Sequence, residues 1–101
     1  MEVVTVIALL MAGILVSNPH PPTLQEIAQR RVEYMAEHNY RWHPPGRAWV
    51  RAGARFEGAG WGRVGLDPHR LPTCLPRRRL SLAADAVAYG RYGVYRIRLW
   101  K

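Results

Sequence analysis

Cysteine is almost missing from this sequence: Cys74 is its single thiol, and two kinds of site are thereby excluded. A lone thiol cannot form an intramolecular disulfide, and it cannot supply the set of thiolates that a cysteine-based zinc site needs. It can still pair with a thiol of another molecule, so an intermolecular disulfide through Cys74 is one interpretation. The other is an unreacted loop thiol, since Pro72 and Pro76 flank it closely.

Acidic residues are also few, because 7 Asp and Glu stand against 15 Lys and Arg, giving a net charge of +8. Once helix capping and ion pairing are allowed for, Glu57, Asp67 and Asp85 are what remains for acid–base chemistry. No Ser/His/Asp or Cys/His set has a spacing that indicates nucleophilic catalysis. We therefore predict a non-enzymatic protein without catalytic residues.

No apolar run reaches the roughly 20 residues that a membrane-spanning helix needs. The longest one, residues 1–16, is apolar except for Glu2 and Thr5. Its length suits the apolar region of a secretory signal, although Glu2 stands where a basic residue is usual. We predict that residues 1–17 are a cleaved signal peptide, with an uncleaved membrane anchor or a buried segment as alternatives. The protein is accordingly expected to be secreted or periplasmic, or else membrane-anchored.

A proline-rich spacer at residues 18–22 leads into the clearest helix of the chain. Thr23 and Glu26 form an S/T-x-x-E capping box, in which each side chain satisfies the backbone N–H of the other residue. Apolar residues then recur at helical spacing, and we expect Arg31 at the edge of this face, its stem buried and its charge in water. Asn39 is suited to end the helix.

The second half of the chain predicts extended structure. Three segments are expected to be extended: Phe56–Gly62, Leu80–Tyr89 and Val94–Trp100. The last two read as a β-hairpin, and we expect the final strand to be an edge strand whose outer face carries Arg96 and Arg98. The prediction is an α+β domain at residues 23–101, with one amphipathic helix packed on a small antiparallel sheet and a C-terminal β-hairpin.

Arginine dominates the basic residues and forms a run at Arg77-Arg78-Arg79. Guanidinium groups suit bidentate contacts with phosphate or carboxylate groups, and they can stack on aromatic rings. An alternative function is therefore binding of nucleic acid, an anionic envelope polymer or a membrane surface through Arg77–Arg79, Arg96 and Arg98. A membrane-tethered structural protein and a merely solvated basic loop are further interpretations of the same residues.

One stretch resembles a known protein family. Its helical part is Leu24-x-x-Ile-Ala28-x-x-x-Val-x-x-Met35-Ala36, followed by His43 and by Phe56-Glu57-Gly-Ala-Gly-Trp-Gly62. This combination resembles the CAP superfamily of cysteine-rich secretory, antigen 5 and pathogenesis-related proteins, and it covers about residues 23–62. The resemblance implies secretion, an α-β-α sandwich, and a cleft in which two histidines and two glutamates can bind a divalent cation.

By this resemblance, His43 matches the first family histidine and Glu57 the first family glutamate. Gly58 stands where the family has asparagine, and the second half of the motif set is absent. An imidazole that faces a carboxylate in a rigid turn can share a proton or hold a metal ion together with waters. We predict a small exported, CAP-like binding domain with a ligand or divalent-cation half-site at His43 and Glu57, and no other cofactor.

Overall fold

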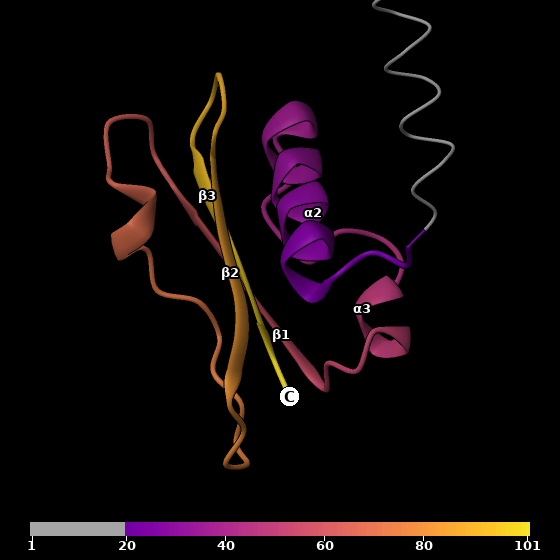
Figure 1. The fold of residues 1–101 in the computed structure, drawn as a ribbon. Coiled ribbons are helices and arrows are strands. Elements are labelled where there is room, and N and C mark those ends of the chain that lie inside the picture. The colour runs from indigo at the N-terminus through magenta and orange to yellow at the C-terminus, as the bar shows by residue number, and fades with distance from the viewer. Residues whose placement is uncertain (1–19) are drawn as a thin grey trace, which may run out of the picture.

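The computed structural model describes residues 20–101, so the predicted leader at residues 1–17 lies outside the described residues. This part of the chain forms two helices, one 3-10 turn and three strands (Figure 1). In order, these elements are α2 (Leu24–His38), α3 (Ala48–Arg51), β1 (Phe56–Gly62), η1 (Pro68–Arg70), β2 (Leu82–Tyr89) and β3 (Val94–Trp100). No helix within residues 20–101 is both long and apolar enough to cross a membrane.

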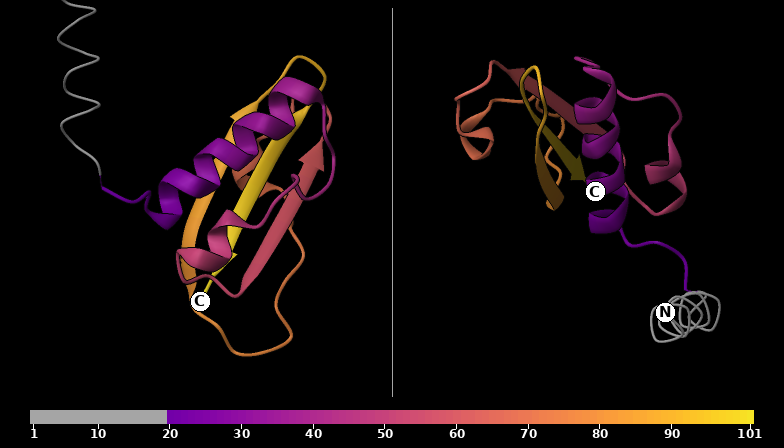
Figure 2. Two further views of the ribbon diagram at one scale, coloured as in Figure 1. Left: turned by 90° about the vertical axis from the view of Figure 1, so that its right-hand side faces the viewer. Right: turned by 90° about the horizontal axis from the view of Figure 1, so that it is seen from above.

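The strands form one antiparallel sheet in the order β1-β3-β2. Helices α2 and α3 lie on one side of this sheet, and the segment that carries η1 lies on the other (Figure 1). The predicted α+β class, with an amphipathic helix on a small antiparallel sheet and a C-terminal β-hairpin, is confirmed. Seen from the helix side, the connection from α2 to α3 passes in front of β1 (Figure 2, left).

The prediction of β3 as an edge strand is wrong, because β3 is the central strand. Its partner on one side is β2, as the hairpin requires, and β1 pairs with its other side from Phe56↔Trp100 to Gly62↔Val94. The edge strands are therefore β1 and β2. The edge of β1 that points away from β3 therefore has no partner strand among the described residues, and the candidate site lies at this edge.

Helix α2 begins and ends as the sequence predicts. Both hydrogen bonds of the capping box are present, and Asn39 adopts the left-handed conformation with φ 48° at the C-terminal end. The Asn39 side chain also accepts a 2.8 Å hydrogen bond from the Tyr95 hydroxyl, which ties the end of the helix to β3. The buried face of α2 packs on β2 and β3, where Tyr95, Ile97 and Leu99 are completely buried.

The glycines of β1 allow residues 71–74 to lie directly on its outer face. A Cβ atom at Gly58 would lie 2.5 Å from the carbonyl oxygen of Cys74, and one at Gly60 would lie 2.4 Å from that of Pro72. Side chains at these two positions would therefore push the loop away from the strand. The glycine-rich sequence of β1 thus fixes where Cys74 lies.

Candidate functional site

The site is built on Glu57, a buried carboxylate on the helix side of β1. Its side chain is 2% exposed, and the guanidinium of Arg31 on α2 binds both of its oxygens. Arg31 Nε donates to Oε2, and Nη2 donates to Oε1 at 3.0 Å. The expectation that the Arg31 head lies in water is wrong, because its charge is paired inside the protein. Such a bidentate, charge-assisted pair offsets the desolvation of both groups.

The same guanidinium also holds the connection between α2 and α3. Arg31 Nη2 donates to the carbonyl oxygen of Pro44 at 2.7 Å, and Nη1 donates to that of Pro45 at 3.3 Å. These carbonyls belong to the stretch that immediately follows His43. Arg31 therefore orients the carboxylate and positions the backbone next to the histidine.

His43 and Glu57, the two residues of the predicted half-site, are in contact. His43 Nδ1 lies 2.9 Å from Glu57 Oε1, and the imidazole is 32% exposed. Since a carboxylate paired with a guanidinium accepts hydrogen bonds, we assign the ring proton to Nδ1. The lone pair of the neutral ring is then on Nε2, on the side away from Glu57.

A third functional side chain, Cys74, lies beside that nitrogen. Its Sγ is 3.8 Å from His43 Nε2 and 3.7 Å from the backbone carbonyl oxygen of Glu57, and the thiol is exposed. Sequence spacing gave no sign of this contact, since 31 residues separate the cysteine from the histidine. The signal that was available is the pair of glycines on one face of β1, which indicates that another segment approaches there.

The geometry changes what the half-site can do with a metal ion. Both Glu57 oxygens are engaged by Arg31 or His43, so the carboxylate orients the ring and is not turned toward the surface. The donor atoms that face outward are His43 Nε2 and Cys74 Sγ. Within residues 20–101, no three His, Cys, Asp or Glu side chains are placed to hold one ion. Ion binding at this site would therefore be weak.

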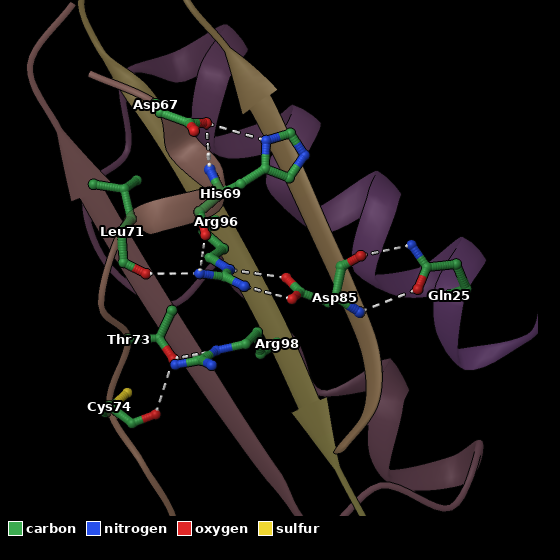
Figure 3. Close-up of polar contacts among 9 residues, drawn as sticks. All are labelled: Gln25, Asp67, His69, Leu71, Thr73, Cys74, Asp85, Arg96 and Arg98. Atoms are coloured by element: carbon green, nitrogen blue, oxygen red, sulfur yellow. Dashed lines mark hydrogen bonds and ion pairs between the residues drawn. The ribbon is translucent and has the colours of Figure 1, made fainter.

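Two arginines of the predicted anion-binding surface, Arg96 and Arg98 on β3, already form hydrogen bonds with other groups of the protein (Figure 3). Arg96 forms a bidentate pair with Asp85, at 2.9 and 2.6 Å, which raises the pKa of the guanidinium. It also donates to the carbonyl oxygens of His69 and Leu71, at 2.8 and 3.0 Å. These contacts attach the η1 segment to the outer face of the sheet.

Arg98 also binds the loop, whereas the run Arg77-Arg78-Arg79 is exposed to solvent. Arg98 Nε donates to Thr73 Oγ1 at 2.9 Å (Figure 3). Arg77, Arg78 and Arg79 are exposed, and they form no ion pair within the described part of the chain. The structure therefore separates the predicted anion-binding residues into an exposed run and two strand arginines that hold the loop.

A groove of about 310 Å³ lies between the start of β1 and the loop that follows Cys74. Apolar and arginine side chains share its wall: Phe56, Leu75, Leu80, Arg55, Arg77 and Arg78. Leu75 directly follows Cys74, and Phe56 directly precedes Glu57. The groove is therefore lined by the chain neighbours of Cys74 and Glu57, and neither of these two residues is part of its wall.

Comparisons with known proteins find no relative of this chain. No protein-family model, curated protein or solved structure matches the chain. The CAP resemblance thus rests on the residues quoted above, and the function has to be argued from the geometry of Arg31, Glu57, His43 and Cys74.

Proposed function

We propose that the chain is a small ligand-binding domain, CAP-like in its first half, that binds a divalent cation weakly at His43. One observation carries this proposal: a buried carboxylate holds His43 Nδ1 at 2.9 Å and leaves Nε2 directed toward the exposed thiol of Cys74. A carboxylate behind an imidazole is the common outer-shell arrangement of metal-binding histidines, since it fixes the tautomer and raises the basicity of the other nitrogen.

Cys74 supplies the second donor of this site. Zinc binds histidine nitrogen at about 2.0–2.1 Å and cysteine sulfur at about 2.3 Å, so the two donors of a tetrahedral ion lie about 3.6 Å apart. The 3.8 Å between Nε2 and Sγ is close to that separation. Nitrogen and sulfur donors favour zinc and cobalt over magnesium or calcium. Waters would complete the coordination, and binding would be weaker than in a closed four-ligand site.

Cobalt titration tests this proposal, because cobalt bound to a thiolate absorbs visible and near-ultraviolet light. The wild-type protein is expected to develop a charge-transfer band that added zinc removes. His43→Gln should lose the band, whereas His38→Gln should keep it, because the His38 ring stacks on Tyr34 of the same helix and hydrogen-bonds to its carbonyl oxygen. An unchanged titration of His43→Gln would refute the proposed site.

A second candidate function, binding of an anionic polymer, is favoured by the exposure of Arg77, Arg78 and Arg79. The triple substitution of this run by glutamine should lower retention on heparin at low salt. The matched control replaces three other exposed arginines by glutamine, so that both variants have the same net charge; they are Arg30, Arg63 and Arg91. Equal losses for the two variants would show a non-specific charge effect and would exclude a site at the run.

Export remains part of the proposal through residues 1–17. A cleaved signal predicts that the mature protein begins at Asn18. Mass spectrometry of protein recovered outside the cytoplasm of an expressing bacterium measures this directly. Intact protein in the membrane fraction would instead support the anchor.

A further inference from the structure

Three side chains of the site form a continuous thiol–imidazole–carboxylate arrangement. Cys74 Sγ lies 3.8 Å from His43 Nε2, and His43 Nδ1 lies 2.9 Å from Glu57 Oε1. We propose that Cys74 is a nucleophile for acyl transfer, with His43 as its general base and Glu57 as a positioning residue. This activity uses the same side chains as the proposed ion site but does not rest on ion binding. It also departs from the sequence-based expectation of a non-enzymatic domain.

The order of contacts gives each group a distinct role. A nucleophile within reach of a base, with the base oriented by a third group, is the arrangement that activates weak side-chain nucleophiles. Glu57 cannot reach the thiol, because Arg31 and His43 take up its oxygens. His43 Nε2 is the neighbouring atom that can accept the thiol proton. The Glu57 carbonyl, 3.7 Å from Sγ, contributes to the placement of the sulfur but is not a base.

The thiol is held by a fixed segment of backbone. The carbonyl oxygen of Cys74 lies where a Cβ atom at Gly58 would be, so the loop packs on β1 without an intervening side chain. The thiol itself is exposed at the open edge of β1. A positioned but accessible sulfur beside an imidazole is what a nucleophilic cysteine requires.

The groove lined by Leu75, the residue that directly follows Cys74, indicates the class of substrate. Its apolar wall includes Phe56, Leu75 and Leu80, and its volume of about 310 Å³ is enough for a short acyl chain. Because Leu75 follows Cys74 directly and lines the groove, we expect an acyl group on Sγ to extend along Leu75 into this space. We therefore expect esters or thioesters of short apolar acyl groups to react, with butyryl esters preferred over acetyl esters.

The reaction proceeds in two balanced steps. First, Sγ attacks the carbonyl carbon, the S–C bond forms and the bond to the leaving oxygen or sulfur breaks. The thiol proton passes to His43 Nε2 and from there to the leaving group. In the second step, water or another acceptor attacks the thioester carbonyl carbon and gives its proton to His43. The bond from that carbon to the acceptor forms, the C–S bond breaks, and His43 returns the proton to the leaving sulfur as the carboxylic acid or transferred product departs.

The probe for this proposal is 4-nitrophenyl butyrate, used on the full chain in the presence of EDTA so that no metal ion covers the thiol. We expect a burst of 4-nitrophenolate equal to the protein concentration and a mass increase of one butyryl group on Cys74. Cys74→Ser should show neither. His43→Gln should acylate at least about a hundredfold more slowly, the lower end of what general-base catalysis contributes, while His38→Gln should react like the wild type.

A relocated thiol provides the sharper control. The double variant Cys74→Ser/Leu75→Cys keeps one exposed cysteine in the same loop, and Leu75 is itself 62% exposed, so the fold should tolerate the change. Its acylation should be as slow as that of His43→Gln. Equal reactivity of the relocated and native thiols, or of His43→Gln and the wild type, would overturn the proposal.

The role of Glu57 has a separate readout that needs no variant. Nitrogen NMR of the wild-type histidines should show the neutral His43 ring protonated at Nδ1, because that atom faces the carboxylate. A neutral ring protonated at Nε2 would leave no base facing Cys74 and would also overturn the proposal. Cobalt binding is measured independently, so its absence alongside normal acylation would reject the ion site while supporting the nucleophile.

Discussion

Two arginine–carboxylate pairs on opposite faces of the sheet are built alike but differ in burial. On the helix side, Arg31 and Glu57 have side chains that are 9% and 2% exposed. On the loop side, Arg96 and Asp85 have side chains that are 14% and 32% exposed. In each pair the guanidinium binds both carboxylate oxygens. The same chemical unit thus exists once in the interior and once near the surface.

Each arginine also donates to two backbone carbonyl oxygens of a connecting segment that lies on its side of the sheet. The carbonyls are those of Pro44 and Pro45 for Arg31, and those of His69 and Leu71 for Arg96. The difference is that the carboxylate of Glu57 has an additional partner, His43, which reaches the surface beside Cys74. The loop-side pair consequently represents the structural role alone, and it serves as an internal control for the helix-side pair.

The largest expected effect is that of Arg31→Ala. Removing one partner of a buried pair leaves the other charge uncompensated and costs about 3–5 kcal/mol of unfolding free energy. Because small domains have total stabilities of about 5–15 kcal/mol, this variant should lose from about a fifth of its unfolding free energy to all of it. Urea unfolding followed by tryptophan fluorescence measures the loss.

Replacing the whole pair shows whether the loss comes from the isolated charge. Arg31→Met/Glu57→Leu removes both charges and should be more stable than Arg31→Ala, as is found when buried ion pairs are replaced by apolar residues. If the double variant is less stable than the single one, the carbonyl contacts of Arg31 matter more than the pairing. The comparison between the two faces would then have to be revised.

Arg96→Ala should have an intermediate effect. It removes the same number of hydrogen bonds as Arg31→Ala, but water can reach Asp85 and the carbonyls that remain. We expect a loss of about 1–3 kcal/mol, measured by the same urea unfolding. Acylation and cobalt binding at Cys74 should fall less in the folded variant than in His43→Gln, because Arg96 anchors the Cys74 loop only through His69 and Leu71 and contacts neither Cys74 nor His43. A loss equal to that of Arg31→Ala would show that burial does not distinguish the pairs.

The sequence contained enough information for the elements and the fold class. Capping of α2 by Thr23, its end at Asn39 and the hairpin of β2 and β3 depend on residues close together in the chain. The buried alternation of β3 could also be predicted, because the period of a strand is visible in its own sequence. These features confirmed the α+β prediction.

What could not be predicted depends on contacts between distant residues. The central position of β3 follows from its pairing with β1, which local patterns do not specify. Arg31 was expected to reach water because nothing near it in the sequence reveals Glu57, 26 residues further on. The resemblance suggested His43 and Glu57, and the structure placed them in contact. Cys74 was missed because spacing alone does not show which segment will lie on Gly58 and Gly60.

His43→Gln should affect function much more than stability. It removes one hydrogen bond of a part-exposed ring, which contributes about 0.5–1.5 kcal/mol, while Arg31 still compensates Glu57. Cobalt binding and rapid acylation should both be lost. His69→Gln is the loop-side counterpart, because His69 contacts the exposed Asp67 at 3.1 Å. It should change neither stability nor function measurably. Similar losses in both variants would remove the distinction between the two faces.

The smallest expected effect is a difference in acid sensitivity between two capping carboxylates. A hydrogen bond from the backbone N–H of Thr23 lowers the pKa of Glu26 at the start of α2. One from the backbone N–H of His69 lowers the pKa of Asp67 at η1. For a lowered folded pKa, the stabilisation is present above the unfolded value, near pH 4, and is lost as pH falls through the folded pKa.

Urea midpoints measured from neutral to acidic pH should therefore decline less steeply in Glu26→Gln and Asp67→Asn than in the wild type. The change should be larger for Glu26→Gln, because Glu26 caps the 15-residue helix that covers the core, whereas Asp67 caps a turn of 3 residues. A steeper decline in either variant would contradict the assigned direction of its pKa shift.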